Sequence, residues 1–352
     1  MKVLHVMAGA DTGGAENIFL ESVVALADAG VEQFVVTRDN NDFRTETFNR
    51  LGIPVRFANF HNYIRFSTKR VVAEAIEEFK PDVIEYWMRR AGTYAPAKYR
   101  ARNVGWYGGY YQLARFKHCE WHVTLTPNLL DHITDQGVRE DKAHIIHTYA
   151  DMNNAAPTDR ASLDTPKDAP VFLALARLHI KKGLDVLLDA TAEVPGAYIW
   201  IAGEGPLRDQ LETQARLLNI EDRVRFLGWR DDRDELLAAC DIVAFPSRYE
   251  PFGTVTVDAW SAKKPLIAAA SQGPGAFVKD GENGLLIPIN DTPALIDAMR
   301  RMMSSAALRK QCVEGGTKSF EEMFTKEVFI RDSLAFYEQV KAHADKKLGT
   351  WS

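Results

Sequence analysis

The 352-residue sequence contains little cysteine, only Cys119, Cys240 and Cys312. Because none of them forms a C-x-x-C pair and their spacing is wide, the sequence predicts neither a zinc site nor a disulfide framework. A chain with so few cysteines suits a reducing compartment, and we expect it in the cytoplasm.

The sequence also lacks long apolar runs and a basic excess. No run approaches the roughly 18 apolar residues of a membrane-spanning helix, and the apolar start at residues 2–7 is too short for a secretory signal. The net charge is −5, which gives no overall attraction to nucleic acid. We therefore expect a protein that does not cross a membrane and does not bind nucleic acid.

Short apolar runs alternate with helical patterns in the first half of the chain. Residues 2–7, 33–37 and 83–85 have the character of buried strands. Residues 15–29 show apolar positions at helical spacing, and the same spacing recurs from Val72 to Phe79. This alternation predicts an α/β fold with a parallel, doubly wound sheet.

The alternation stops in a polar, loop-like stretch at about 151–167 and then restarts. We predict two domains, residues 1–155 and 165–325, each a complete α/β unit. A final helix at about 326–348 carries an apolar stripe that must be buried, and we expect it to pack back on the first domain. In the second half the predicted strands are 171–176, 197–202, 224–227, 242–245 and 265–269, and the predicted helices are 183–193, 207–218, 234–239 and 254–261.

Open α/β sheets bind ligands at the carboxyl ends of their strands, so the loops there carry the chemistry. After the first strand, Gly13 and Gly14 precede a helix and would let a ligand approach its backbone N–H groups. The loop matches neither a Walker A motif nor G-x-G-x-x-G. A simple tight turn is the alternative interpretation.

Two cations bracket the turn after the 171–176 strand. Arg177 offers a fork of donors and Lys182 a point charge, and both suit a diphosphate. A solvated basic turn is the alternative. Gly205 lies in a further turn, after the 197–202 strand, which leaves room for a ligand.

A third group follows the 242–245 strand. Glu250 lies before Pro251-Phe252-Gly253, and Asp258 lies eight residues later, about two turns into the next helix. Carboxylates accept two bonds from vicinal hydroxyls, so Glu250 suits a sugar and Asp258 a ribose. The N–H groups of residues 252–254 can face a phosphate or a sugar. The alternative makes Glu250 a helix-start charge and Asp258 a surface residue.

These motifs occur in one order along the chain, and together they resemble the retaining glycosyltransferases of the GT-B fold called family 4, or glycosyl transferases group 1. The resemblance is clearest at about 171–290, where it includes the glycine-rich segment 280–286. It implies two Rossmann-like domains facing a central cleft, with the donor in the C-terminal domain. It also implies hexose transfer from a UDP- or GDP-sugar.

Carried over to this sequence, the resemblance implies catalytic roles for Glu250, Arg177 and Lys182. Arg177 and Lys182 would hold the donor diphosphate, Glu250 would contact the transferred sugar, and Asp258 the ribose. The implied donor-binding residues are Gly14, Arg177, Lys182, Gly205, Glu250, Pro251, Phe252, Gly253, Thr254 and Asp258.

The sequence departs from the family at three places. Asp258 stands where the family has Glu, Ala276 where it usually has Glu, and residues 104–111 contain no His where many members carry one. Asp232-Arg233-Asp234 has the letters of a D-x-D metal motif, but it precedes a helix, where Asp is a favoured cap. We therefore expect no metal and no cofactor, the nucleotide-sugar being a substrate.

Residues 86–119 contain no Asp or Glu but many basic and aromatic residues. This block suits an anionic acceptor or an anionic membrane surface, such as the inner face of the cytoplasmic membrane. An aromatic core with a solvated basic rim is the alternative. The predicted acceptor-binding residues are Gly13, Glu16, Arg89, Arg90 and Tyr110.

The predicted acceptor is a glycan or lipid-linked glycan, such as a lipopolysaccharide core intermediate or another surface polysaccharide. If so, replacing Arg89, Arg90, Arg100 and Arg102 should weaken acceptor use. Two other functions remain open at this point: a sugar-nucleotide epimerase or phosphorylase of the same fold, and a non-catalytic nucleotide-sugar-binding protein.

Overall fold

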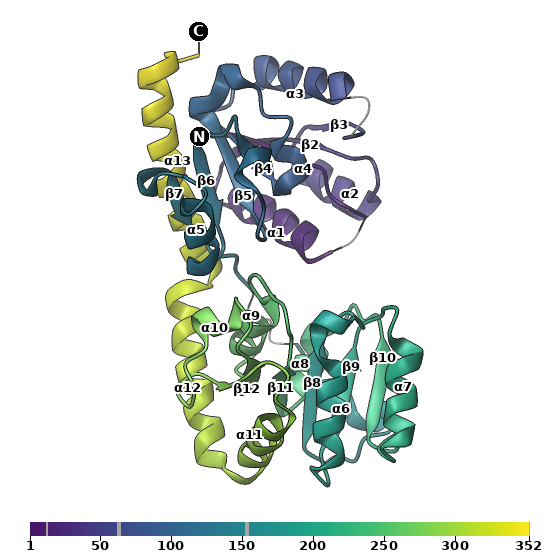
Figure 1. The fold of residues 1–352 in the computed structure, drawn as a ribbon. Coiled ribbons are helices and arrows are strands. Elements are labelled where there is room, and N and C mark those ends of the chain that lie inside the picture. Colours follow the sequence, from purple (N-terminus) through teal and green to yellow (C-terminus); the bar gives the residue numbers. More distant parts are fainter. Residues whose placement is uncertain (12, 62–64, 152–154, 352) are drawn as a thin grey trace. The chain divides into compact units, whose positions relative to one another are not determined.

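The computed structural model describes residues 1–11, 13–61, 65–151 and 155–351. The chain divides into two compact units. Unit 1 comprises Met1–Thr148 and Lys326–Ser352, and unit 2 comprises Tyr149–Thr325 (Figure 1). Unit 1 is therefore discontinuous in sequence, because its last segment follows the whole of unit 2.

Unit 1 contains a seven-stranded sheet in which every recorded strand pair is parallel. The strand order is β3-β2-β1-β4-β5-β6-β7, so the winding reverses between β1 and β4. The strands are β1 (Lys2–Met7), β2 (Glu32–Thr37), β3 (Val55–Phe57), β4 (Val83–Trp87), β5 (Asn103–Tyr107), β6 (Trp121–Thr124) and β7 (Ala143–Ile145).

The α-helices of unit 1 are α1 (Gly14–Asp28), α2 (Asp42–Arg50), α3 (Arg65–Phe79), α4 (Met88–Gly92), α5 (Pro127–Thr134) and α13 (Lys326–Leu348). Local sequence explains some of their starts. The Thr126 hydroxyl accepts a hydrogen bond from the N–H of Leu129, and Pro127 occupies the first turn of α5.

The C-terminal helix α13 covers the sheet of unit 1. Phe336 packs edge-on against Trp121 of β6 and lies beside His144 of β7. Farther along the helix, Asp345 pairs with the buried Arg102 at 2.7 Å. The apolar stripe of this helix thus has its partner within unit 1.

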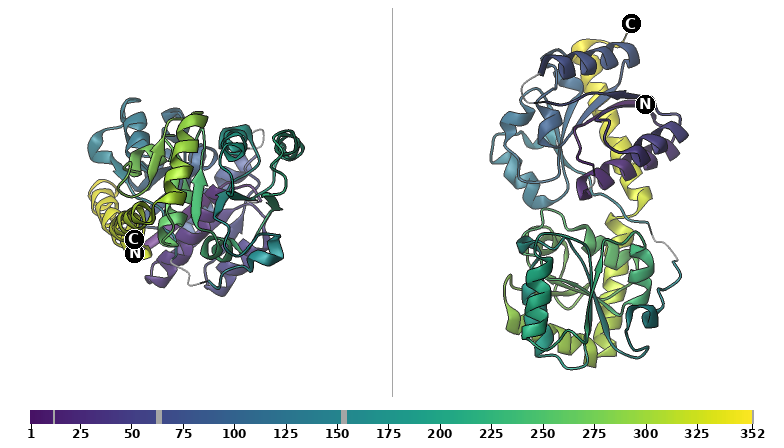
Figure 2. Two further views of the ribbon diagram at one scale, coloured as in Figure 1. Left: turned by 90° about the horizontal axis from the view of Figure 1, so that it is seen from below. Right: turned by 90° about the vertical axis from the view of Figure 1, so that its right-hand side faces the viewer.

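Unit 2 contains a six-stranded sheet in the order β10-β9-β8-β11-β12-β13, again with parallel pairs. Its winding reverses between β8 and β11. The strands are β8 (Val171–Leu175), β9 (Tyr198–Ala202), β10 (Val224–Gly228), β11 (Ile242–Phe245), β12 (Leu266–Ala269) and β13 (Leu285–Ile287). Figures 1 and 2 show helices on both faces of each sheet. The predicted α/β, doubly wound fold is confirmed.

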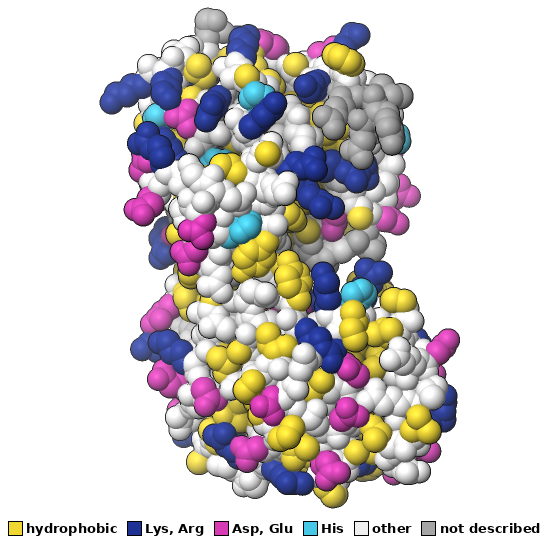
Figure 3. Space-filling model, viewed as in Figure 1, with side chains coloured by type: hydrophobic (Ala, Val, Ile, Leu, Met, Phe, Trp, Pro, Cys, Tyr) yellow, Lys and Arg dark blue, Asp and Glu magenta, His cyan; other side chains and the backbone are white. Residues whose placement is uncertain are grey.

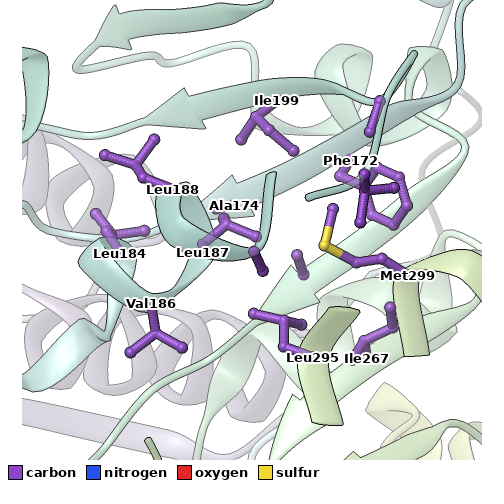
Figure 4. Packing of buried hydrophobic residues seen from close by; sticks show 14 of the residues in the cluster. Phe172, Ala174, Leu184, Val186, Leu187, Leu188, Ile199, Ile267, Leu295 and Met299 are labelled. Carbon is purple, nitrogen blue, oxygen red and sulfur yellow. The ribbon is translucent and has the colours of Figure 1, made fainter. Parts of the chain in front are cut away.

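The α-helices of unit 2 are α6 (Leu184–Ala192), α7 (Arg208–Leu217), α8 (Arg233–Ala239), α9 (Thr254–Ser261), α10 (Pro274–Phe277), α11 (Thr292–Ser304) and α12 (Ala306–Met323). Figure 4 shows part of the core that they form with the sheet, where Phe172, Ile199 and Met299 are fully buried. This packing fixes the strand ends from which the functional loops emerge.

The polar stretch predicted as a linker belongs to unit 2, and part of it packs against the rest of that unit. Arg160 donates to the carboxylate of Asp241 at 2.9 Å and to the Ala239 carbonyl at 2.7 Å. Residues 152–154 of that stretch lie outside the described residues. Across the described ranges, none of the helices is both long enough and apolar enough to span a bilayer.

Candidate functional site

The loops after β8 and β11 meet at the point where the strand order of unit 2 reverses. Gly183 begins α6 with a φ of 66°, and a Cβ atom there would lie 2.2 Å from the Pro246 carbonyl oxygen. Only glycine allows both this backbone conformation and this approach. Such a switch point is where open α/β sheets bind ligands.

Side chains fasten the two loops together. The ammonium of Lys182 and the carboxylate of Glu250 form an ion pair, with 26% and 12% of their side chains exposed. The Arg248 guanidinium donates two hydrogen bonds, of 2.7 and 2.6 Å, to the Asp185 carboxylate. The Arg248 N–H also donates to the Lys181 carbonyl at 2.8 Å. The structure thus brings together two predicted site residues that lie 68 positions apart.

The guanidinium of Arg177, which follows β8, lies at the same edge of the sheet and has no acidic partner among the described residues. Its side chain is exposed, and within the described ranges no acid lies within ion-pair distance of it. Lys181, by contrast, directs its ammonium over the Tyr249 ring at 4.4 Å. An anion bound at this edge could therefore pair with Arg177 without displacing another group. To pair with Lys182 it would have to replace the carboxylate of Glu250.

The turn after β9 packs against the turn that contains Arg177 and Leu178. A Cβ atom at Gly205 would lie 2.5 Å from the Leu178 carbonyl oxygen. The Leu178 N–H donates to the Glu204 carbonyl at 3.0 Å. Packing therefore accounts for the glycine at position 205, which positions its neighbours.

Backbone contacts hold the start of α9. Gly253 precedes Thr254 with a φ of 84°, and Phe252 is buried against Phe277. The Gly273 N–H donates to the Glu250 carbonyl at 2.8 Å. Since the Phe252 side chain is part of the core, the segment 251–254 can offer a ligand mainly its backbone N–H groups.

Asp258 lies about one turn into α9, not the two turns expected, because the helix begins only at Thr254. Its carboxylate is buried and lies 3.2 Å from an Arg233 nitrogen. Burial raises its pKa to about 6, although Arg233 opposes the rise. Asp258 is therefore not the surface residue of the alternative interpretation, and sequence reasoning missed its partner Arg233.

The capping interpretation of Asp232 is wrong in its detail. Asp232 is the residue before α8, but its carboxylate caps no helix N–H and instead accepts from Arg230 at 2.7 Å. Asp234 accepts from Arg233 at 3.1 Å. Among the described residues, His, Cys, Asp and Glu side chains form no group of three or more that could hold a metal ion.

In unit 1 the corresponding switch point lies between β1 and β4. Glu16 turns back on its own loop, where it accepts from the Ala10 N–H at 2.7 Å. The space around the Gly14 Cα atom is open, whereas a Cβ atom at Gly13 would meet the Glu16 carboxylate. Gly14 therefore leaves room for a ligand at the helix start, and Glu16 orders the loop.

Arginines gather at the carboxyl ends of β2 and β4. Arg89 and Arg90 are exposed on α4, directly after β4. Arg38 follows β2, and its pKa is lowered by burial and by the charge of Arg90. Tyr110 lies farther along, with its ring 5.0 Å from that of His132. Arg38 was missed, although it directly follows a predicted strand.

The structure separates the members of the 86–119 block. Trp87 and Trp106 stack within the core at 4.3 Å between ring centroids. Arg102 is 1% exposed and pairs with Asp345, so it cannot serve an acceptor. The expectation that all four arginines act together is wrong for Arg102, and the aromatic-core interpretation holds for the two tryptophans.

Comparison with known proteins agrees with this architecture. The family model described as Glycosyl transferases group 1 matches residues 156–319, and that described as Glycosyltransferase Family 4 matches residues 12–154. The lipopolysaccharide core biosynthesis glycosyltransferase LpsE of Rhizobium meliloti is 34% identical over 93% of this chain and 96% of its own. LpsD of the same organism is 32% identical over 96% of this chain and 98% of its own.

Solved structures share the fold. The structure of Anabaena Alr3699/HepE in complex with UDP and glucose has a TM-score of 0.81 at 21% identity, and the match covers 96% of this chain and all of that one. Two doubly wound units of this kind form the GT-B architecture. The chain belongs to the glycosyl transferases group 1 family, and the predicted resemblance is confirmed.

Proposed function

We propose that this glycosyltransferase moves a hexose from a UDP- or GDP-sugar to a glycan or lipid-linked glycan, with retention of anomeric configuration and without a metal. The proposed pathway is the assembly of lipopolysaccharide core or another surface polysaccharide. The observation that carries the donor half is the Lys182–Glu250 ion pair beside the unpaired Arg177 at the switch point of unit 2.

The charges at this point fit the departure of a nucleoside diphosphate. As the bond between the anomeric carbon and the diphosphate oxygen breaks, negative charge grows on that oxygen. Arg177 and Lys182 neutralise it, which is the electrostatic part of catalysis. When Lys182 turns to the phosphate, the Glu250 carboxylate becomes free to accept bonds from sugar hydroxyls.

The acceptor hydroxyl oxygen attacks the same face of the sugar from which the diphosphate leaves. Its proton passes to the departing phosphate oxygen, so no protein nucleophile is required. Asp258 holds the ribose, Gly14 of unit 1 serves the donor, and Arg89 and Arg90 of unit 1 serve the acceptor. Two curated relatives named for lipopolysaccharide core biosynthesis support the choice of acceptor.

Donor binding is tested with a thermal-shift panel of UDP, GDP, ADP and their sugars. A ligand of the native state raises stability by RT ln(1+[L]/Kd), so the preferred nucleotide stands out. We expect Arg177→Ala and Lys182→Ala to lose most of that shift, whereas the exposed neighbour Lys181→Ala keeps it. Equal shifts in all variants would contradict the donor site.

The reaction is tested by incubating the protein with the preferred sugar nucleotide and a lipopolysaccharide core acceptor in the presence of EDTA. NMR of the product should show the donor's anomeric configuration. Inversion would contradict retention, and loss of turnover with EDTA would contradict metal independence. Conversion of the sugar nucleotide without acceptor would instead indicate an epimerase.

A further inference from the structure

Unit 1 contains a cavity of about 950 Å³ that the proposed function does not use. Glu120 and Lys142, which line it, directly precede β6 and β7, so it lies at the amino ends of these strands. The loops proposed for the acceptor lie at the carboxyl ends. A strand of five residues, such as β5, separates the two edges by about 17 Å.

The lining of this cavity is strongly basic. Five cations and one acid contribute side chains. The acid, Glu120, is already shared between Lys347 at 2.8 Å and His343 at 2.7 Å. The cations are Arg100, Lys117, Arg139, Lys142 and Lys347.

Three of these cations, Arg100, Lys117 and Lys142, have no acid of the described residues within ion-pair distance. Arg139 pairs with Asp141 at 2.8 Å, and Lys142 lies over the Trp121 ring at 3.5 Å. Arg100 and Lys117 are exposed, and no acid of the described residues lies within ion-pair distance of either. Figure 3 shows Lys and Arg side chains gathered over the end of unit 1 where α13 finishes.

Neighbouring histidines report the resulting positive field. The pKa of His118 is lowered by burial and then by the charges of Lys117 and Arg100. His122, in the cavity wall, has its pKa lowered to about 4 by burial and by Arg100. The charge of Arg100 therefore contributes to lowering the pKa of both histidines.

The remaining wall suits an organic body attached to the anion. Leu113 is apolar and half-buried, Phe116 and Val138 are apolar but buried, and Gln112 adds an exposed amide group. Small-molecule sites enclose about 300–1,000 Å³, so this cavity is large enough for more than an inorganic ion.

We propose that this cavity is a second ligand site of the chain, which binds a small organic phosphate, such as a sugar phosphate, through Arg100 and Lys117. A guanidinium fork and an ammonium together suit a phosphate. The two phosphate-binding cations precede β5 and β6, at the amino edge of the sheet, whereas Arg89 and Arg90 follow β4 at its carboxyl edge, so we place this site apart from sugar transfer.

The test is calorimetric titration of the full chain with glucose 6-phosphate, and with glucose as the uncharged probe. We expect glucose 6-phosphate to bind and glucose not to bind. Arg100→Glu with Lys117→Glu should weaken binding at least about tenfold. The matched control, Arg50→Glu with Arg70→Glu, carries the same change of charge on exposed residues of unit 1 that do not line the cavity.

A further variant excludes the donor site as the source of the signal. Arg177→Ala with Lys182→Ala should bind glucose 6-phosphate as the wild type does, and its failure would place the phosphate in unit 2. The His118 imidazole signal in NMR, assigned through His118→Gln, should shift during the titration. The proposal is overturned if glucose 6-phosphate does not bind at millimolar concentration, if the control loses binding equally, or if the His118 signal does not move.

Discussion

Tyr337 donates its hydroxyl hydrogen to Glu85 Oε1 at 2.9 Å, although 252 positions separate the two residues in the sequence. Trp106 donates to the same oxygen at 2.9 Å, and His5 Nδ1 lies 3.0 Å from the other carboxylate oxygen. Both His5 and Glu85 are fully buried. The last helix of the chain thus supplies one of two hydrogen bonds to Oε1 of a buried carboxylate on β4, while Oε2 accepts none from the described residues.

We expect Tyr337→Phe to destabilise unit 1 by about 1–3 kcal/mol, because it removes one hydrogen-bond donor from a buried carboxyl group. Urea unfolding would measure the change. Tyr198→Phe is the control, since no hydrogen bond is recorded for that hydroxyl among the described residues. An unchanged midpoint in Tyr337→Phe would show that the bond adds nothing.

Substitution of Arg102 and of Arg89 should distinguish a role in stability from a role in acceptor binding. We expect Arg102→Ala to cost about 3–5 kcal/mol, because it leaves Asp345 without its partner in a largely buried ion pair. The exposed Arg89→Ala should change stability by less than about 0.5 kcal/mol while raising the KM for the acceptor. Thermal unfolding and acceptor kinetics on both variants would check this. An equal loss of stability in Arg102→Ala and Arg89→Ala would contradict these different roles.

Asp258 predicts a pH effect on stability. Burial holds its pKa at about 6 in the native state, against about 3.9 in an unfolded chain. The native state therefore keeps a proton that the unfolded chain loses between these values. The stabilisation is complete below about pH 4 and is lost as the pH rises through 6, a change of about 3 kcal/mol.

Asp258→Asn cannot titrate, so the stability of the wild type relative to this variant should fall between pH 4.5 and pH 8. Urea unfolding at both pH values would measure the difference. Asp297→Asn, at an exposed carboxylate, should show no such trend. A constant difference for Asp258→Asn would contradict the raised pKa.

Gly273 packs against the loop that carries Glu250, so a substitution there tests whether the position of this loop matters for activity. A Cβ atom there would lie 1.9 Å from the Phe252 carbonyl oxygen, so Gly273→Ala must displace the segment that carries Glu250. We expect kcat/KM for the donor to fall by at least about tenfold, that is about 1.4 kcal/mol of transition-state stabilisation. In the matched control Gly275→Ala, the nearest atom lies at an ordinary 3.6 Å, and activity should persist.

Local patterns predicted much of unit 2. Strand 242–245 and helix 254–261 have the predicted bounds, because a short buried run ends in Pro246 and the αL residue Gly253 starts the helix. Strands β5 to β7 were not predicted, since they are only three to five residues long and Gly105 interrupts the apolar run of β5.

Contacts distant in sequence were beyond local reasoning. The pairing of Asp258 with Arg233 and of Arg102 with Asp345 depends on how separate elements pack, which no spacing reveals. The loops that carry Arg177, Lys182 and Glu250 were found because they follow strands, yet the ion pair itself appears only when β8 and β11 lie side by side.

The discontinuity of unit 1 affects the order in which the protein is built on the ribosome. The strands of unit 1 are synthesised first, but the helix that covers them emerges only after all of residues 149–325. Unit 2 can fold as soon as it has left the exit tunnel, because all of its strands and helices are contiguous in the chain. Until α13 emerges, the part of the unit 1 sheet that this helix covers, including Trp121 of β6, stays exposed, so chaperone demand should be concentrated on the N-terminal half during translation.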